Sequence, residues 1–401
     1  MEKDGKAVGF DPMDPSFAVD PHPSLHRLRA TDPVHRMASG EWVLTRHADV
    51  VAALHDPKLH TGWGTAEETR AIYGDGRLTD YLTRRLSRYN PPEHTRLRSL
   101  VSRPFTPRRI AGLHAHTADL AARLLADVSE QGSFDFMEAI AHPLPSLVIS
   151  ELIGIPERDR GQHTEWTTAL QAAMAKPAAV PARVEGEAAA AAQWDYLDDL
   201  ARQRRDEPRD DLTSALLFAE EHRQRLSRDE VVATLMFLFA AGHSTTRDLL
   251  GSGLLAMLAA RDQFARLTAD PALASPAVEE CLRFDSPITM LRRRAVAETT
   301  IGGRQIRAGD RVVAVLLAAN RDPKRFADPD RFLIDRVDNR PVAFGGGIHF
   351  CVGAALARME AQAVFNALAA AVPDLVLAGG PVEWRDTPLF RGPIAVPCAH
   401  S

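Results

Sequence analysis

The chain has 401 residues, of which 45% are apolar, 25% charged and 6% aromatic, and its formal net charge is −5. This composition supports a large buried core, and its slightly acidic balance gives no indication of a nucleic-acid partner. Three scattered cysteines are too few for a disulfide framework, the N-terminus lacks the apolar core of a signal peptide, and no apolar run reaches the roughly 18 residues of a membrane span. We therefore expect a cytoplasmic, monomeric protein that is rich in helix.

The first 90 residues combine short elements with irregular stretches. Residues 1–40 are punctuated by prolines and should wrap the surface, with a flexible end at about residues 1–10. WVLTR, residues 42–46, predicts a short strand, and HADVVAALHDPKLH predicts a helix that ends at its Asp-Pro step. Residues 61–90 show weak periodicity and two glycine-bearing turns, which predicts a long loop. Loops of that length often cover a binding site, so we interpret residues 61–90 as a lid.

The middle of the chain, from residue 91 to about 200, has a mainly helical pattern that two prolines interrupt in AKPAAVPARVEGEAAAAA. We interpret this stretch, at about residues 170–192, as a mobile cap between two helices. A longer helix begins at Ser227, which together with Glu230 fits a capping box. It runs for about 30 residues, or ~45 Å, and must therefore cross the middle of the molecule.

The main sheet signal is VAETTIGGRQIRAGDRVVAVLLA, residues 296–318, which alternates and turns at Gly302-Gly303. DLVLAG and PIAVP, near the C-terminus, predict two more short strands. The fold class is therefore mainly α, with a smaller β-rich part.

AFGGGIHFCVGAALARME, residues 343–360, places Cys351 before an alanine-rich helix. Unpaired N–H groups and the helix macrodipole at such an N-terminus stabilise a thiolate. The glycines allow a sharp turn and a close approach to a flat group. The residues alone leave three interpretations open: a buried structural cysteine, a nucleophile activated by His349, and a thiolate ligand of a metal cofactor.

The spacing of this stretch resembles the cysteine loop of the cytochrome P-450 family, F-G-x-G-x-H-x-C-x-G. Every fixed position is present: Phe344, Gly345, Gly347, His349, Cys351 and Gly353. The resemblance covers about residues 10–400 and implies one cytochrome P-450 domain over residues 1–401. It implies a haem b between the long central helix and the helix that follows the loop. Cys351 would be the iron ligand, with Phe344, Gly345 and Gly353 in the haem-binding loop.

Two further motifs match the family's pattern. AVEECLRF contains the E-x-x-R pair Glu280 and Arg283, which share one helix face and can form an ion pair. Alone, such a pair is common on protein surfaces. The resemblance adds Arg331, in DPDRF, as the third member of a buried triad that braces the cysteine loop.

NPPEHTRLR resembles the family's D-P-P-E-H-T-x-x-R, with Asn90 in place of aspartate. The resemblance implies that His94 and Arg98, together with Arg293 and His349, bind the two haem propionates. Four basic groups suit two carboxylates, because charged propionates are not buried unpaired.

The middle of the long helix, AGHSTT at residues 241–246, is a polar break in an apolar run. Serine and threonine there can simply bond to the carbonyl four residues earlier and bend the helix. The resemblance implies an oxygen-binding groove at this bend, in which Thr245 orients dioxygen. The candidate catalytic residues are Gly242, His243, Ser244 and Thr245.

Ser244 stands where the family has an acid, and serine does not titrate near neutral pH. One hypothesis is that His243 or a water chain replaces the acid, so that the enzyme hydroxylates its substrate. The alternative is oxidative coupling of an indole or phenol substrate, such as a tryptophan-containing cyclic dipeptide.

The resemblance also indicates a substrate pocket between the lid, the cap, the long helix and the C-terminal turn. Its apolar candidates are Trp63, Phe237, Leu238, Ala241, Ile288, Met290 and Phe390. Small residues over the iron leave room for a bulky, rigid, hydrophobic natural product of secondary metabolism.

The chain has no flavin or ferredoxin module, so we expect a separate ferredoxin and its NAD(P)H-dependent reductase. A basic patch of His349, Arg358 and Arg108-Arg109 is the expected docking face. Two rival classes are a non-catalytic helical binding protein and a cysteine hydrolase that uses Cys351 and His349. The hydrolase lacks an acid near His349 to orient its base.

Overall fold

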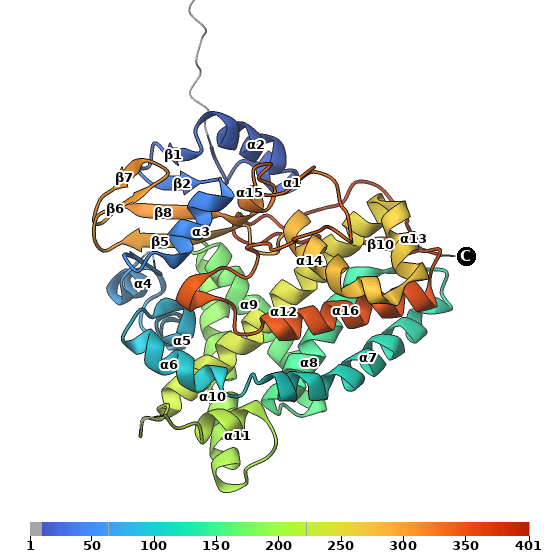
Figure 1. The fold of residues 1–401 in the computed structure, drawn as a ribbon. Helices are drawn as coiled ribbons and strands as arrows, with labels where there is room; N and C mark the ends of the chain where they lie inside the picture. The colour runs from blue at the N-terminus through green and yellow to red at the C-terminus, as the bar shows by residue number, and fades with distance from the viewer. Residues whose placement is uncertain (1–9, 63, 222, 401) are drawn as a thin grey trace, which may run out of the picture.

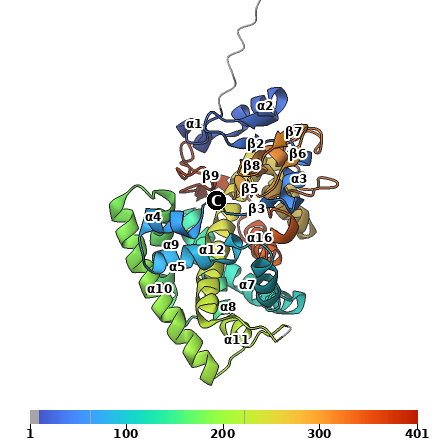
Figure 2. The same cartoon turned by 90° about the vertical axis from the view of Figure 1, so that its left-hand side faces the viewer.

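The structure is a computed structural model that describes residues 10–62, 64–221 and 223–400. Helices form a broad body, and most strands gather at one corner of it beside the N-terminal helices (Figures 1 and 2). The predicted fold class, mainly α with a smaller β-rich part, is confirmed. The flexible end predicted for about residues 1–10 lies outside the described residues, except for Phe10, which is buried against Phe17. No helix in the described ranges combines the length and the apolar content that crossing a membrane requires.

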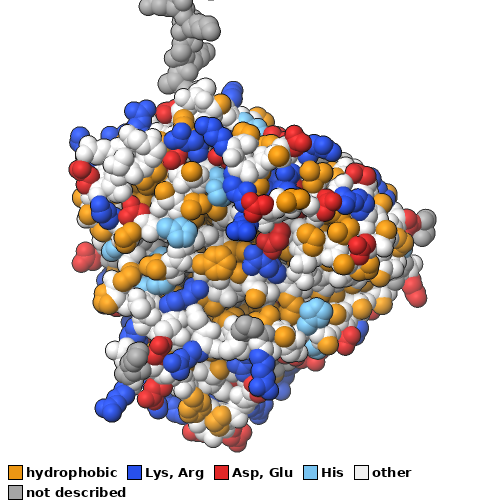
Figure 3. Space-filling model, viewed as in Figure 1, with side chains coloured by type: hydrophobic (Ala, Val, Ile, Leu, Met, Phe, Trp, Pro, Cys, Tyr) orange, Lys and Arg blue, Asp and Glu red, His pale blue; other side chains and the backbone are white. Residues whose placement is uncertain are grey.

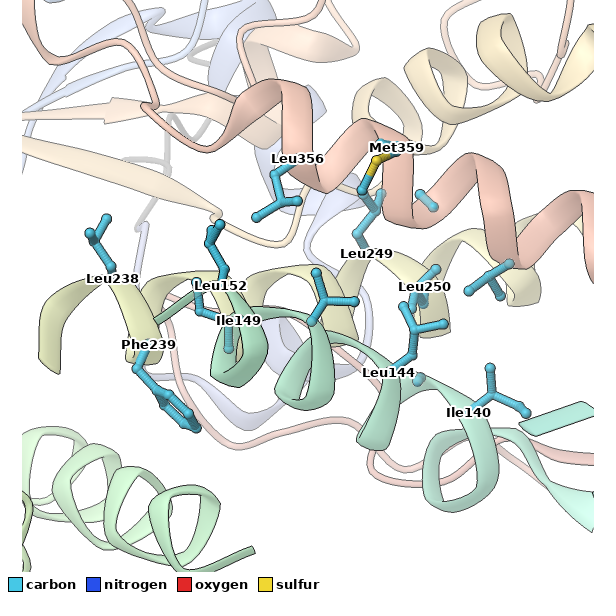
Figure 4. Packing of buried hydrophobic residues seen from close by; sticks show 14 of the residues in the cluster. Ile140, Leu144, Ile149, Leu152, Leu238, Phe239, Leu249, Leu250, Leu356 and Met359 are labelled. Carbon is cyan, nitrogen blue, oxygen red and sulfur yellow. The ribbon is translucent and has the colours of Figure 1, made fainter. Parts of the chain in front are cut away.

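The long helix predicted from Ser227 is α12, Arg228–Ala259. Ser227 Oγ accepts a hydrogen bond from Glu230 N, and the Glu230 carboxylate accepts one from Ser227 N, so the predicted capping box is confirmed. Apolar side chains of α12 pack between those of α8 (Pro143–Ile153) and α16 (Ala354–Ala371), as Figure 4 shows. Each fully buried side chain of this kind contributes about 1.5–3 kcal/mol, and together they fix α12 in the centre of the molecule.

The main sheet has the strand order β1-β2-β8-β5-β3, in which β2 and β8 are parallel and the other pairs antiparallel. Its strands are β1 (Val34–Arg36), β2 (Trp42–Leu44), β3 (Leu59–His60), β5 (Met290–Ala295) and β8 (Arg311–Val315). The strand predicted at residues 42–46 is therefore β2. The segment 296–318 contains β8 and a hairpin of β6 (Thr299–Ile301) and β7 (Arg304–Ile306). That hairpin turns where predicted, at Gly302 and Gly303, whose φ values of 54° and 80° favour glycine.

A smaller sheet of order β4-β10-β9 joins the C-terminal strands to the helical body. The predicted strand in DLVLAG is β9 (Val376–Leu377), and β10 (Pro397–Ala399) begins at the last residue of PIAVP. No sequence signal predicts β4 (Ser133–Asp135), because three residues are too short to show alternation.

The lid at residues 61–90 is mostly helical, so the predicted long loop is wrong. It contains α4 (Ala66–Tyr73), α5 (Arg77–Arg84) and one 3-10 turn, η1 (Leu86–Arg88). Thr65 and Glu68 form a capping box like that of α12, and α5 buries Leu78 and Leu82, which lie four residues apart. The overall periodicity is weak because a glycine-bearing turn separates two helices of only eight residues each.

The cap at residues 170–192 is also mostly helical. Helix α9 (Arg160–Ala175) and helix α10 (Val180–Asp206) are separated only by residues 176–179. Pro181 lies in the first turn of α10, where proline removes no intrahelical hydrogen bond. The proline that we interpreted as a break therefore begins a helix.

The remaining helices surround these parts. They are α1 (Pro15–Val19), α2 (His22–Thr31), α3 (His47–His55), α6 (Glu93–Ser102), α7 (Pro107–Ser129), α11 (Leu212–Leu217), α13 (Arg261–Ala269), α14 (Ala274–Phe284) and α15 (Leu316–Asn320). Short turns are η2 (Met137–Ala141), η3 (Glu157–Asp159), η4 (Pro271–Leu273) and η5 (Gly347–His349). Helix α3 ends directly before the Asp-Pro step, as predicted.

Candidate active site

The cysteine loop lies between η5 and α16, against the C-terminal end of α3. Gly347 has a φ of 63°, and a Cβ there would collide with the carbonyl oxygen of Leu54. Its N–H donates to His55 Nε2 at 3.1 Å. Cys351 N donates to Phe344 O at 3.1 Å, which closes the loop. Contact with α3 is therefore one reason for glycine here, beside the close approach that the sequence suggests.

Cys351 is exposed, whereas Cys281 and Cys398 are buried, so the interpretation as a buried structural cysteine is wrong. Although the residue has exposed surface, neighbouring protein atoms partly desolvate its sulfur, and this desolvation raises the pKa of the thiol; the Gly353 N–H and the charges of Arg98 and Arg358 act in the opposite direction. The pKa lowering expected of a helix N-terminus is therefore outweighed by desolvation. A metal ligand at this position would bind as the thiolate and release the proton.

Beside this loop, the four predicted propionate-binding residues lie together although they come from three elements. His94 and Arg98 lie on α6, Arg293 on β5 and His349 on η5. The ring centroids of His94 and His349 are 4.2 Å apart. Burial and then the neighbouring bases, His94 first, lower the pKa of His349 to about 3. Burial and Arg98 also lower the pKa of His94.

Two atoms of this basic cluster have unused hydrogen-bonding capacity. Nε2 of His94 and Nε2 of His349 are buried and have no hydrogen-bond partner in the described part of the chain. Buried polar atoms are normally paired, and the charged groups that act most strongly on His349 are all bases. The cluster therefore fits the carboxylates of an anionic ligand. His60, at the end of β3, belongs to the same set of bases, and no motif marks it in the sequence.

Behind the loop, Glu280 and Arg283 form the predicted ion pair, with Nε and Oε2 2.7 Å apart and neither side chain exposed. The predicted third partner, Arg331, is wrong: its side chain is 70% exposed and faces Asp328. Arg336 takes that place, with its Nε 3.1 Å from Glu280 Oε2. Arg331 contributes only its carbonyl oxygen, which accepts hydrogen bonds from Arg283 and Arg336.

The middle of α12 presents one partly exposed row on a helix that is otherwise largely buried here. Phe237, Ala241 and Thr245, at four-residue spacing, make this row, which we call the α12 row. Ser244 Oγ donates to Ala240 O at 2.9 Å, and Thr245 Oγ1 donates to Ala241 O at 2.6 Å. These are the bonds to the carbonyl four residues earlier that the sequence allows, and the helix continues through them without a break.

His243 lies on the opposite side of α12 from the α12 row. Its ring centroid is 4.7 Å from that of His142 and 6.3 Å from that of Phe239. Burial, with Arg247 next, lowers the pKa of His243 to about 3, so the imidazole is neutral at neutral pH. Gly242 packs against the side chain of Ile149 on α8.

Comparison with known proteins shows to which family the chain belongs. The sequence profile of cytochrome P450 matches residues 272–368. The vitamin D(3) 25-hydroxylase of Pseudonocardia autotrophica is 42% identical over 94% of this chain and 93% of its own length. The P450 monooxygenase PikC of Streptomyces venezuelae is 38% identical over 95% of this chain and 91% of its own length. The crystal structure of CalO2 superposes with a TM-score of 0.93 at 33% identity, covering 98% of this chain and 99% of that one.

The chain is a cytochrome P450. Relatives of this similarity are named monooxygenases and hydroxylases, so the protein is an oxidoreductase of the monooxygenase type with the fold of the family. Members of the family carry a haem whose iron is bound by a cysteine thiolate.

The P450 brings two of the predicted pocket residues together from distant parts of the chain. Ile288 forms a β-bridge with Phe390, and Thr289 N donates to Leu389 O at 3.1 Å. Asp285 binds Arg391, which also donates to the carbonyls at the end of α1. The C-terminal turn that carries Phe390 is thereby held against the segment that leads from α14 into β5 and carries Ile288.

Other predicted pocket residues of the P450 lie elsewhere. Met290 is 2% exposed and belongs to a core cluster with Phe10 and Phe17, so its assignment to the pocket is wrong; on β5 it faces away from Leu291. Leu238 is buried, and Figure 4 shows it and Phe239 on opposite sides of α12. Trp63 lies outside the described residues.

The basic docking patch expected on the P450 is partly neutralised. Arg358 forms an ion pair with Glu279, and Arg109 forms one with Asp210. Basic and acidic side chains are interleaved on the face in Figure 3. Two of the arginines expected to attract an acidic partner therefore have acidic neighbours of their own.

Proposed function

We propose that Cys351 is the thiolate ligand of a haem b iron and that the haem lies between the cysteine loop and the α12 row. An exposed thiol beside a cluster of bases, two of whose buried nitrogens have no partner among the described residues, supports this proposal most strongly. His94, Arg98, Arg293 and His349 would hold the two propionates. When bound, the haem supplies oxygen activation, to which a thiolate ligand contributes electron density.

The α12 row forms the wall of the reaction site that faces the substrate. Because Thr245 Oγ1 donates its proton to Ala241 O, its lone pairs remain available to accept a hydrogen bond. Phe237 and Ala241 line the same face with apolar surface and disfavour bulk water there. Thr245 is thus the polar group of this row and the residue that handles protons at the site.

The substrate is a bulky, rigid, hydrophobic natural product, and the reaction is insertion of one oxygen atom, by hydroxylation. Ala241 on the row and the neighbouring Ala240 leave space there, and Ile288 and Phe390 supply apolar contacts from another part of the fold. The names of relatives refer to vitamin D(3) 25-hydroxylation, 6-deoxyerythronolide B hydroxylation and polyketide biosynthesis. These names support a ligand of secosteroid or macrolactone size.

The test is a panel of secosteroids, macrolactones, terpenes, phenols and cyclic dipeptides. Binding is followed by the shift that a ligand causes in the haem absorption spectrum, and turnover is run under isotopically heavy dioxygen. We expect a secosteroid or macrolactone to bind and its product to gain one heavy oxygen atom. Binding of none of these compounds, or a product without the label, would contradict the proposal.

A second candidate is oxidative coupling of an indole or phenol substrate. It is favoured by Ser244, because its hydroxyl donates to Ala240 O and provides no titratable acid at this position. The same experiment separates the two reactions, because a coupled product of a cyclic dipeptide contains no oxygen from dioxygen.

Electrons come from a separate ferredoxin and its NAD(P)H-dependent reductase. The relatives matched over nearly their full length are P450s of similar size to this chain. Monomeric state and cytoplasmic location stay predictions.

A further inference from the structure

Asp248 is the carboxylic acid in the interior of α12. In residues 228–259, all of which the structure describes, the other carboxylates are Asp229 and Glu230 in the first turn. Residues three and four apart share a helix face, so Asp248 lies one turn from both Thr245 and Ser244. Its side chain has no exposed surface. The acid that is missing at position 244 is therefore matched by an acid one turn further along the same helix.

Two arginines hold this carboxylate. Arg247 Nε lies 3.0 Å from Asp248 Oδ1, and Arg385 Nη1 lies 3.2 Å from Oδ2. The backbone of Gly392 approaches so closely that a Cβ would collide with the Asp248 carboxylate. Because Arg385 N also donates to Gly392 O at 3.1 Å, the C-terminal turn closes over the acid.

The same group of side chains connects the interior to the surface. The Arg247 side chain is 9% exposed, whereas that of Arg385 is 26% exposed. His142, whose ring contacts His243, is also partly exposed. Asp248 thus has a partner that reaches solvent, as a group that takes up protons requires.

Several polar atoms around Asp248 are buried without a partner in the described chain. They are Arg247 Nη2 and both ring nitrogens of His243. Such atoms are commonly paired with internal water, which also carries protons. Burial raises the pKa of Asp248, although Arg247 and Arg385 act in the opposite direction. The acid is thereby moved closer to neutral pH, where proton transfer is efficient.

We infer that Asp248 replaces the acid missing at position 244 and passes protons from water at Arg385 to the hydroxyls of Ser244 and Thr245. This inference rests on the proposed monooxygenase function. Each turnover takes up two electrons from the ferredoxin and two protons; one oxygen atom enters the substrate and the other leaves as water. In each transfer, an Asp248 oxygen takes a proton from a hydronium ion and releases it through water to Ser244 Oγ. Ser244 then releases its own proton, which it donates to Ala240 O at rest, through water towards Thr245, and Asp248 is a carboxylate again.

The test compares Asp248→Asn with Asp211→Asn, the same substitution at another buried ion pair, with Arg204. The substrate is the panel compound that the wild type oxidises, and product formed and hydrogen peroxide released are measured per NAD(P)H consumed. We expect product per NAD(P)H to fall about tenfold or more in Asp248→Asn and to stay at the wild-type level in Asp211→Asn. Adding Ser244→Glu to Asp248→Asn should restore it to within about threefold of the wild type.

A second measurement does not depend on turnover or on the stability of Asp248→Asn. An infrared titration of the holoenzyme should contain a carboxylic acid band whose midpoint lies above that of ordinary aspartate. Arg385→Gln should move this midpoint to higher pH, because the charge of Arg385 lowers the pKa of Asp248. Asp211→Asn should leave the midpoint unchanged.

Glu360 on α16 is the competing acid: it is buried, its Oε2 has no partner in the described chain, and burial raises its pKa. Three results would each overturn the inference. They are an unchanged yield of product per NAD(P)H in Asp248→Asn, a loss of that yield in Glu360→Gln instead, and an infrared band whose midpoint does not move in Arg385→Gln. If the wild type shows neither the absorption spectrum of thiolate-ligated haem nor any product, the proposed function itself is contradicted. If the wild type and Asp248→Asn both form product with the same high yield per NAD(P)H, the inference is wrong and the proposed function still stands.

Discussion

At the scale of single residues, the buried carboxylate of Glu280 accepts hydrogen bonds from Arg283, Arg336, Asn339 and a backbone N–H. The pair with Arg283 could be predicted because a spacing of three residues fixes a shared helix face. The other arginine could not, since Arg331 and Arg336 both lie in a stretch without regular structure, where no periodicity tells which side chain points inward. The motif DPDRF pointed to Arg331, which is the exposed one of the two arginines.

Replacement of Arg336 by alanine should destabilise the protein by about 3 kcal/mol or more, because it removes one partner of a fully buried carboxylate. Arg331→Ala is the matched control and should change the unfolding free energy by less than about 0.5 kcal/mol. Urea unfolding of both variants measures the difference. Equal losses in the two variants would contradict the assignment of Arg336.

His243 should make stability depend on pH. Its pKa is about 3 in the folded protein, against about 6.5 in the unfolded chain, so the unfolded state binds more protons between these values. The stabilisation is present above pH 6.5 and is lost as the pH falls towards 3, by up to about 1.4 kcal/mol per pH unit. His243→Phe should lose less stability than the wild type on acidification from pH 7 to pH 4.

The control for this comparison is the exposed His114. His114→Gln should keep the wild-type dependence of the urea midpoint on pH. If His243→Phe and the wild type lose the same stability, His243 is not held neutral by the fold.

At the scale of elements, the lid and the cap are joined by side chains of α10. The Glu187 carboxylate accepts hydrogen bonds from Arg77 N at 2.7 Å and Leu78 N at 3.0 Å, and so caps the first turn of α5. Arg183 donates to the carbonyl oxygens of Ile72, at the end of α4, and Pro177, between α9 and α10. The capping boxes of α4 and α12 are local and readable from sequence. The cap of α5 comes from a residue more than 100 positions away, which explains why this segment reads as a loop.

Removal of this cap should loosen the lid without unfolding the protein. Glu187→Ala should cost α5 about 1 kcal/mol, which corresponds to roughly fivefold faster amide exchange at Arg77 and Leu78. Glu185→Ala, two residues earlier on the exposed side of α10, is the control and should leave that exchange unchanged. Hydrogen exchange followed by mass spectrometry measures both. Equal exchange in the two variants would show that Glu187 does not hold α5.

At the scale of the whole molecule, local patterns predicted the two pieces between which we propose that the haem lies: the long central helix and the cysteine loop with the helix after it. They also predicted β2 and the β6–β7 hairpin, because alternation and glycine turns are local signals. The strand order β1-β2-β8-β5-β3 joins residues that are hundreds of positions apart, and no local pattern contains it. The basic cluster beside Cys351 draws on three elements in the same way, so the cluster could be named from the resemblance but not positioned from the sequence.

The central claim is that the sulfur of Cys351 binds the haem iron. The measurement is the absorption spectrum of the protein reduced with dithionite under carbon monoxide, for the wild type, Cys351→Ser and Cys281→Ala. The account predicts the long-wavelength band of thiolate-ligated haem in the wild type and in Cys281→Ala, where the cysteine removed is a buried one on α14, and its loss in Cys351→Ser. A colourless wild type, or the same band in Cys351→Ser, would contradict it.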